Sequence, residues 1–375
     1  MLSNDGEAGL DVLAEFSFDG LTSPALVVNL DRVETNLGLM IASVTSRGAA
    51  LRPHAKTHKS VNLGRMQLEH GATGLTVATL SEAAMFAAAG IDDLFVAYPV
   101  WPTGDRLRML TMLMASTRRL RLGVDSSEGA ARIGAAARSA GGPVEVLIEA
   151  DCGGGRSGVR SIEAALAVAR SATEAGLSVV GVFTHGGHSY GSRDGVRAAA
   201  DDEVLTLRRY GEALRSHGFD VRELSAGSTP TSHQKERTGV TEERPGTYVF
   251  NDRLQVRLGA CDWSAVALTV QATVVSVSRD HVIVDAGAKV LSSDLPAGLE
   301  GYGVLPKYPA AMISRLYDHH GVVLPGDGPR PRLGETVVVV PNHVCPVVNL
   351  AGRLQIVSGS KPIDPWPVDG QGLVT

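Results

Sequence analysis

The chain has 375 residues, of which 44% are hydrophobic and 20% charged, and its formal net charge is -5. This composition is that of an ordinary globular protein with room for one large and one smaller domain. The charges form no long run of one sign, which argues against nucleic acid or an anionic membrane as the main partner. No apolar stretch approaches the roughly 20 residues that cross a bilayer.

The cysteines and the first residues predict a cytoplasmic protein. Cys152, Cys261 and Cys345 are too few and too scattered for a disulfide framework, so a reducing compartment is expected. Residues 1–16 are acidic and lack a basic segment followed by an apolar one. We therefore expect no secretory signal there.

Apolar strand-like runs alternate with alanine-rich helical runs between residues 22 and 250. After an apolar run at 22–30 and a helix at 31–44, strands are predicted near 49–55, 74–79, 93–98, 119–124, 144–150, 178–184, 222–226 and 246–250. Helices are predicted between them at 60–71, 81–90, 104–116, 126–141, 161–176 and 204–218. This alternation indicates βαβ units and a parallel sheet. Eight such strands predict a (β/α)8 barrel, with a doubly wound open sheet as the alternative.

The pattern changes after residue 260. Residues 267–287 and 334–350 are rich in valine, with turn residues between them and no long helical run. Such segments are typical of a β-rich domain. We predict a barrel over residues 22–260, followed by a smaller β-rich domain over 261–375 that also takes in residues 1–21.

Glycine and hydroxyl residues stand at the last two predicted strands of the barrel. The seventh strand ends in Gly227-Ser228-Thr229, and the eighth begins at Gly246-Thr247-Tyr248. Turns of this composition are common, so each segment alone is a weak signal. Phosphate sites in parallel barrels often use the loops after these two strands. Together the segments predict a phosphate cradle.

One lysine has unusual neighbours. A lysine at a strand end is usually a solvated surface charge. Lys56, however, follows the first predicted barrel strand in a segment crowded with Arg52, His54, His58 and Lys59. Such crowding lowers a lysine's pKa toward the neutral amine that attacks a carbonyl. Lys289, at another predicted strand end, is the second candidate.

The loops after the fifth and sixth barrel strands carry further polar groups. Arg156 follows a glycine triplet, so its guanidinium is able to approach a planar cofactor closely. His185 and His188 flank two glycines after the sixth strand. A lone histidine there is more often a hydrogen-bonded structural residue. The nearby Tyr190 favours a lined pocket instead.

The β-rich part contains a His-x-Cys pair, His343 and Cys345. If the segment is extended, residues two apart share a face, so the imidazole and the thiolate converge on one ion. Catalytic zinc usually has three protein ligands. The remaining positions are then filled by water and substrate, or by one of Asp318, His319 and His320.

With these segments assembled, the sequence resembles the D-serine dehydratase and D-threonine aldolase family, which shares the pyridoxal-phosphate barrel and β-domain of alanine racemase. The segments that carry the resemblance are LRPHAKTHK, THGGHSY, GSTPT, RPGTYVFND and PNHVCPVVN. It implies that Lys56 is the cofactor-bound lysine and the base for the α-proton. It places Arg156 and His185 around the pyridoxal ring, beside a cradle of Ser228, Thr229, Gly246, Thr247 and Tyr248. His343 and Cys345 match metal ligands, with zinc, or another divalent ion such as manganese, as the ion.

The resemblance implies a lyase that removes water from D-serine, D-threonine or 3-hydroxy-D-aspartate, giving an α-keto acid and ammonia. The His-x-Cys pair resembles the dehydratase branch, since the aldolase branch looks like His-x-Asp. Retro-aldol cleavage to glycine and an aldehyde is the alternative. A non-catalytic pyridoxal-phosphate carrier and a metal-dependent barrel hydrolase are two others, and carriers of that kind look like the barrel alone. A homodimer is also implied.

Two departures from the family pattern bear on the shape of the substrate. Relatives often have Glu-Glu-His-Gly where this chain has Asp318-His319-His320-Gly321. The loop before Arg156 is DCGGG, which offers fewer side chains than many relatives have there.

Overall fold

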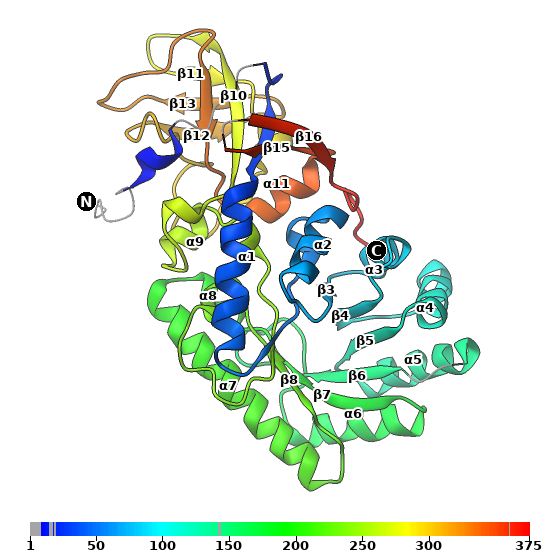
Figure 1. Cartoon of the computed structure of the whole chain (residues 1–375). Coiled ribbons are helices and arrows are strands. Elements are labelled where there is room, and N and C mark those ends of the chain that lie inside the picture. The colour runs from blue at the N-terminus through cyan, green and yellow to red at the C-terminus, as the bar shows by residue number, and fades with distance from the viewer. Residues whose placement is uncertain (1–8, 15–17, 19, 142–143, 360) are drawn as a thin grey trace.

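The structure is a computed structural model that describes residues 9–14, 18, 20–141, 144–359 and 361–375. A barrel surrounded by helices forms one part of the molecule, and a β-rich part lies against the end of the barrel (Figure 1). Helix α1 (Leu30–Thr45) runs from the β-rich part along the barrel. The two-part division predicted from the change in sequence pattern is thus visible in the fold.

Eight parallel strands form the barrel. Their order is β2 (Ala50–Leu51), β9 (Glu242–Glu243), β8 (Glu223–Ala226), β7 (Ser178–Phe183), β6 (Glu145–Glu149), β5 (Arg119–Val124), β4 (Asp93–Pro99) and β3 (Leu75–Val77). A parallel bridge between His54 and Thr76 joins the two ends of this row. The Thr76 N–H also donates to the Pro53 carbonyl at 2.9 Å. The sheet therefore closes, which confirms the predicted barrel and excludes the open sheet.

Six of the helices around the barrel follow its strands, and four of these six begin at a hydroxyl cap. The six are α2 (Val61–Glu69), α3 (Leu80–Ala88), α4 (Gly104–Ser116), α5 (Ser127–Ala140), α6 (Ile162–Glu174) and α7 (Arg193–Ser216). Thr79, Ser126 and Ser161 each accept a hydrogen bond from a backbone N–H in the first turn of the following helix. Ser192 does the same for α7, which therefore begins eleven residues before the predicted 204. A cap of this kind contributes about 1 kcal/mol.

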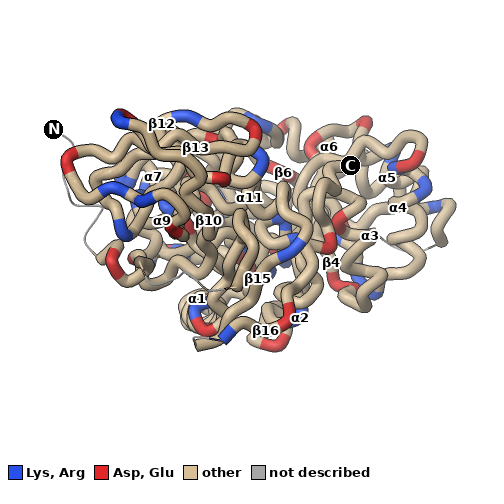
Figure 2. The backbone as a smooth tube through the Cα atoms, turned by 90° about the horizontal axis from the view of Figure 1, so that it is seen from above, with Lys and Arg blue, Asp and Glu red and all other residues tan. Residues whose placement is uncertain are grey.

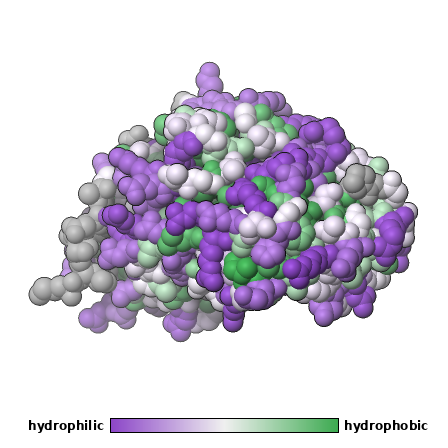
Figure 3. All heavy atoms as spheres, turned by 90° about the horizontal axis from the view of Figure 1, so that it is seen from below, coloured by the Kyte–Doolittle hydropathy of each residue, from purple (hydrophilic) through white to green (hydrophobic). Residues whose placement is uncertain are grey.

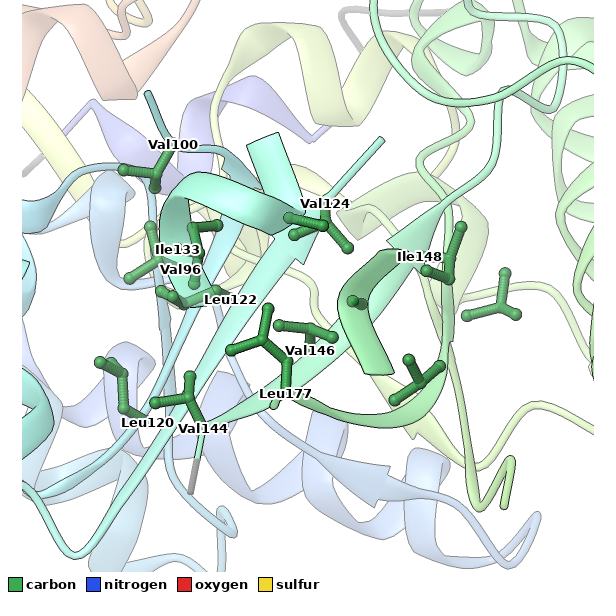
Figure 4. Packing of buried hydrophobic residues seen from close by; sticks show 14 of the residues in the cluster. Val96, Val100, Leu120, Leu122, Val124, Ile133, Val144, Val146, Ile148 and Leu177 are labelled. Atoms are coloured by element: carbon green, nitrogen blue, oxygen red, sulfur yellow. The ribbon is translucent and has the colours of Figure 1, made fainter. Parts of the chain in front are cut away.

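The barrel has an apolar shell and a charged inner layer. Between strands and helices, Val96, Leu122 and Val146 pack with Ile133 of α5 (Figure 4). Inside the barrel, Glu242 Oε2 lies 2.7 Å from Arg52 Nε and 2.8 Å from Arg121 Nη1. Because every member of this layer has an ionic partner, the barrel holds charge without leaving it unpaired.

The eighth strand differs from the prediction. It is β9 at 242–243, whereas the predicted strand at 246–250 contains the 3-10 turn η5 (Thr247–Val249). The backbone at Gly246 passes so close to its neighbours that a Cβ there would lie 2.8 Å from Thr57 Oγ1. Buried apolar residues fit a strand or a turn equally well, so periodicity did not separate the two. The first strand likewise ends at Leu51, and Lys56 lies in the turn η3 (Ala55–Thr57).

The β-rich part is built on one long strand, β10 (Leu268–Val277). The sheet runs β12 (Met312–Leu316), β13 (Gly321–Leu324), β11 (Val282–Val284), β10, β1 (Ala25–Asn29), β15 (Arg353–Ser358) and β16 (Lys361–Pro367), and β14 (Thr336–Val339) also pairs with β10. Strand β1 lies in this sheet, although its residues fall within the range predicted for the barrel. Leu10 and Leu13 pack here against Trp263. The prediction also assigned residues 1–8, 15–17 and 19 to this domain, and these lie outside the described residues.

The end of the chain returns to the barrel beside α3 (Figure 1). The Gly370 N–H donates to the Lys59 carbonyl, and the Ser81 N–H donates to the Thr375 carbonyl, both at 2.9 Å. The Lys59 ammonium donates to the Leu373 carbonyl at 2.7 Å. These contacts hold the loop that follows Lys56.

Residues of opposite charge alternate along the backbone (Figure 2), and hydrophilic and hydrophobic side chains are mixed on the face opposite to that view (Figure 3). Lysine and arginine are interspersed with aspartate and glutamate in Figure 2. Seen from the opposite side, hydrophilic side chains cover most of the face, with small apolar areas between them (Figure 3). In the described part of the chain, no helix is long and apolar enough to cross a bilayer.

Candidate active site

A pocket lies at the carboxyl ends of the barrel strands, where parallel barrels place their functional residues. It is lined by His54, Lys56, Thr57, Ala97, Arg156, Phe183, His185, Tyr190, Gly227, Ser228, Arg244, Gly246 and Thr247. A second cavity of about 330 Å³ adjoins it and shares Arg156, His185 and Tyr190 with it. A larger open depression between α6 and α7 lies away from these strand ends and carries none of the predicted site residues.

Most of the residues predicted from the sequence converge on this pocket. Lys56 enters from the first loop, Arg156, His185 and Tyr190 from the loops after β6 and β7, and Ser228, Gly246 and Thr247 from those after β8 and β9.

Thr229 and Tyr248 are not among the lining residues. The Thr229 hydroxyl accepts a hydrogen bond from the Tyr248 N–H at 3.0 Å. The Tyr248 hydroxyl accepts one from Gln67 Nε2, and its ring packs in the core. Both residues therefore support the pocket wall from behind.

The Lys56 side chain is exposed at the pocket, and its pKa is lowered. Desolvation by the surrounding protein atoms is the main cause, and the Arg156 and Arg244 guanidinium groups act in the same direction, against the Cys345 thiolate and Glu82. The direction agrees with the sequence prediction, but the cause differs. The lysine's charged neighbours are brought by other loops of the barrel, because parallel strands deliver all their carboxyl ends to one place.

The cationic sequence neighbours of Lys56 have other partners. Arg52 pairs with Glu242 inside the barrel, and Lys59 pairs with Glu82 at 3.2 Å. His58 lies 3.2 Å from the Gln67 side chain. The second candidate lysine, Lys289, is 58% exposed, pairs with Asp318 and does not line the pocket.

The two pocket histidines are neutral. Burial lowers the pKa of His54 and His185 well below the usual value, and the Lys56 and Arg156 charges add to the effect. The His185 ring lies 6.2 Å from the Tyr190 ring, so the two form one wall. His188, by contrast, lies 3.1 Å from the Asp202 carboxylate and is not a lining residue.

Arg244 lines the pocket and was missed by the sequence reasoning. Its Nε donates to Ser225 Oγ at 2.8 Å, and its Nη2 donates to the Thr184 carbonyl at 2.6 Å. Its guanidinium carbon lies 5.7 Å from the Phe95 ring centroid and 5.3 Å from that of Phe183. The arginine directly precedes the PGTYVF segment, so its position was a usable signal.

The His343–Cys345 segment is not extended, as the sequence reasoning assumed. Strand β14 ends at Val339, His343 is the N-cap residue of α11 (Val344–Leu350), and Cys345 lies in its first turn. The two side chains nevertheless meet. Burial alone would lower the pKa of His343, but the Cys345 thiolate and the Asp294 carboxylate raise it to about 11. In turn, His343 and Lys56 lower the pKa of Cys345 against the effect of burial.

The Asp294 carboxylate, which the sequence did not mark as a site residue, orients the His343 imidazole. The His343 Nδ1 donates to Asp294 Oδ2 at 2.7 Å, so Nε2 is the nitrogen left for a metal ion. The previously considered Asp318 pairs with Lys289 instead. Within the described ranges, no group of three or more histidine, cysteine, aspartate or glutamate side chains is gathered as a metal site. Over the described residues, the candidate site therefore consists of two side chains, His343 and Cys345.

The pair lies at the edge of the barrel pocket. Cys345 Sγ is 3.4 Å from Thr57 Oγ1 and 3.8 Å from Thr247 Oγ1, and both threonines line the pocket with Lys56. A small molecule bound at Lys56 is therefore within reach of groups from both parts of the fold.

Comparison with known proteins agrees with this architecture. Residues 28–253 match the model of the alanine racemase N-terminal domain, and residues 267–357 match a model described as "Putative serine dehydratase domain". The D-threo-3-hydroxyaspartate dehydratase of Delftia sp. (strain HT23) is 35% identical, over 92% of this chain and 97% of its own length. The D-threonine aldolase of Arthrobacter sp. is 31% identical, over 94% and 93%.

The solved structure of the Delftia dehydratase is similar throughout. It has a TM-score of 0.87 at 34% identity and covers 93% of this chain and 97% of that chain. A variant of that enzyme, with a cysteine replaced by alanine, has been solved in a metal-free form with the same TM-score. The family model of the alanine racemase N-terminal domain matches more than half of the chain, and the model of the serine dehydratase domain matches the β-rich part. This chain therefore belongs to the alanine racemase N-terminal domain family, in the arrangement that carries a serine dehydratase domain after the barrel.

Proposed function

We propose that this protein is a pyridoxal-phosphate- and metal-dependent lyase that removes water from a small D-β-hydroxy amino acid. The observation that carries the proposal is the position of Lys56. Its amine lines a pocket that also contains glycine and hydroxyl groups, and it lies near the His343–Cys345 pair. The similar dehydratase and aldolase both act on substrates of this class, as their names state.

The pocket residues fit the cofactor. A Cβ at Gly227 would lie 2.6 Å from Ser232 Oγ, and one at Gly246 would lie 2.8 Å from Thr57 Oγ1, so bare backbone forms this wall. Ser228 and Thr247 add hydroxyl donors beside it. Backbone and hydroxyl groups in such a cradle suit a phosphate. Lys56 would hold pyridoxal phosphate, which would supply an electron sink that no side chain offers.

The chain's own residues then bind and move protons. The lowered pKa of Lys56 favours the neutral amine that accepts the substrate's α-proton. Arg156 and Arg244 place positive charge along the wall, where a carboxylate or phosphate is attracted. Phe183 and Ala97 contribute apolar surface that excludes water beside the reacting carbon.

The His343–Cys345 pair fits a divalent metal ion. Asp294 fixes Nδ1 of the imidazole, and the lowered pKa of Cys345 favours the thiolate, which is the form that binds metals. His343 and Cys345 would hold the ion, which would supply Lewis-acid assistance to the departure of a β-hydroxyl, otherwise a poor leaving group. Zinc is the ion that we propose, because thiolate and imidazole together suit zinc better than manganese.

An aldolase reaction is the second candidate, and the 31% identity to a D-threonine aldolase favours keeping it. The same residues would serve it, with loss of the hydroxyl proton and cleavage of the Cα–Cβ bond. The cysteine at position 345 supports the dehydratase, since the aldolase branch resembles His-x-Asp at this pair.

We also propose a homodimer in the cytoplasm. The three unpaired cysteines support the compartment, and sedimentation would measure the subunit number.

Product analysis tests the proposal. The purified protein is incubated with D-serine, L-serine, D-threonine and D-threo-3-hydroxyaspartate, with and without a chelator. Keto acid and ammonia from a D-substrate, lost with chelator and restored by zinc, are the expected result. Glycine and an aldehyde would move the protein to the aldolase reaction. No turnover, despite a cofactor absorbance band that is absent from Lys56→Ala, would indicate a carrier.

A further inference from the structure

A carboxylate lies behind the arginine of the proposed cofactor pocket. Glu149 is the last residue of β6, and its side chain is 4% exposed. The loop over residues 150–159 returns to the same strand end, because the Val159 N–H donates to the Glu149 carbonyl at 2.8 Å. Arg156 belongs to this loop, and its Nη2 lies 4.0 Å from Glu149 Oε1.

The two carboxylate oxygens of Glu149 differ in their hydrogen bonds. Oε1 accepts a hydrogen bond from Ser157 Oγ at 2.9 Å. Oε2 is buried and has no hydrogen-bond partner among the described residues, although every carboxylate oxygen has lone pairs that accept donors. Both oxygens belong to a side chain that lines the cavity of about 330 Å³ beside the cofactor pocket. An arginine fork is the group that satisfies two carboxylate oxygens together.

The Arg156 guanidinium is a suitable partner for the Glu149 carboxylate. Its backbone is held, since Asp151 Oδ1 accepts hydrogen bonds from the Gly153 and Gly155 N–H groups at 3.0 Å. Its side chain is 63% exposed, and over the described ranges Glu149 is the one carboxylate within 4.0 Å of it. The guanidinium lines both the pocket of Lys56 and the cavity of Glu149. Glu149 is therefore the carboxylate placed to bias the direction of this long side chain.

We propose that Glu149 is a positioning residue that holds the Arg156 guanidinium against the cofactor pocket. The inference rests on the proposed function, because it takes Arg156 as part of the cofactor site. Glu149 acts through Arg156 and does not itself line the pocket of Lys56. Loss of its charge leaves Arg156 free to extend into water, where it is better solvated and no longer lines the pocket.

Cofactor binding by variants of the holoenzyme tests whether Glu149 acts through Arg156. The dissociation constant of pyridoxal phosphate is measured by absorbance titration for Glu149→Gln, Glu149→Asp, Arg156→Ala and the double variant Glu149→Gln/Arg156→Ala. We expect Glu149→Gln to raise the dissociation constant about tenfold, which is within the usual coupling of side chains in contact. Glu149→Asp, which keeps the charge, recovers most of the affinity. The double variant binds no worse than Arg156→Ala alone.

A matched control removes a hydrogen bond without removing charge. Ser157→Ala deletes the donor to Oε1 and is expected to bind the cofactor nearly as the unchanged protein does. Thermal unfolding shows which variants are folded. If Glu149→Gln does not fold, Glu149→Met, which also removes the charge, completes the same cycle with and without Arg156→Ala.

Three outcomes overturn the inference. Glu149→Gln binds the cofactor as tightly as the unchanged protein, or it weakens binding by the same factor whether or not Arg156 is present. In either case Glu149 does not act through Arg156, while the proposed function stands. An unchanged protein that binds no pyridoxal phosphate contradicts the proposed function itself, and the inference with it.

Discussion

The Asp252 carboxylate, at the end of the barrel, accepts a hydrogen bond of 3.0 Å from the backbone N–H of Val344 in the β-rich part. Its other oxygen accepts one of 2.9 Å from the Gln255 N–H. One buried side chain therefore caps both α9 (Arg253–Arg257) and α11, the helix that begins between His343 and Cys345. The placement of the proposed metal ligands relative to the barrel depends on this junction.

Replacing Asp252 with alanine should destabilise the protein and loosen the metal site together. Two buried backbone donors lose their acceptor, and each unsatisfied group costs about 1–3 kcal/mol. We expect a lower free energy of unfolding in urea and a weaker zinc affinity. Asp262→Ala is the control, because that exposed residue precedes a 3-10 turn without a side-chain cap. Loss of stability with unchanged zinc affinity would show that the junction does not position the pair.

Lys56→Ala should abolish both the bound-cofactor absorbance and turnover, without unfolding the chain. The Lys56 amine is the proposed proton acceptor, and such a group contributes about 10²–10⁴-fold to the rate. Activity, absorbance and circular dichroism are measured on the same sample. Lys289→Ala, at an exposed lysine outside the pocket, should leave all three unchanged. The roles are wrongly assigned if the Lys289 variant loses the absorbance band and the Lys56 variant keeps it.

Asp294→Asn should weaken metal binding. The asparagine side chain is neutral, so it no longer draws the Nδ1 proton of His343 as the carboxylate does at 2.7 Å. Losing an outer carboxylate of this kind typically costs about 10–100-fold in metal affinity. Competition with a chelator of known affinity measures the change, and Asp318→Asn is the matched control because Asp318 pairs with Lys289. Equal affinities in the two variants would contradict the orienting role.

Acid should destabilise the barrel through Glu242. Burial would raise the pKa of Glu242, but Arg52 and Arg121 lower it from 4.5 to about 2. A carboxyl whose pKa is lowered on folding stabilises the protein above its unfolded pKa, and this contribution is lost as the pH falls from about 4.5 to 2. The full loss, reached below both pKa values, is on the order of 3 kcal/mol for such a difference. Urea unfolding at pH 5 and pH 3 measures about half of it, because pH 3 is still above the pKa of the folded state.

The Glu242→Gln variant provides the comparison. It leaves two buried arginines without their shared carboxylate, which should cost about 3–5 kcal/mol at pH 5. Its stability should then change less between pH 5 and pH 3 than that of the unchanged protein. An equal change in both proteins would assign the acid sensitivity to other groups.

The sequence alone determined the barrel and most of its pocket. The strand predicted at 119–124 is β5 without change, and the helix predicted at 104–116 is α4 without change. Alternation of apolar strands and helices is a local property, and in a parallel barrel it places every strand end at one rim. Lys56, Arg156 and Ser228 could therefore be assigned to one pocket before their distances were known.

Only the tertiary structure decided which groups meet. The sequence does not separate strand from turn at 246–250, because the segment is buried in either form. It also does not show that Asp294 faces His343 or that Glu149 faces Arg156, since nothing in the spacing of these residues marks them as partners. Periodicity reports which side of an element is buried. The partner that a buried charge finds depends on which distant segments the packed fold brings against it.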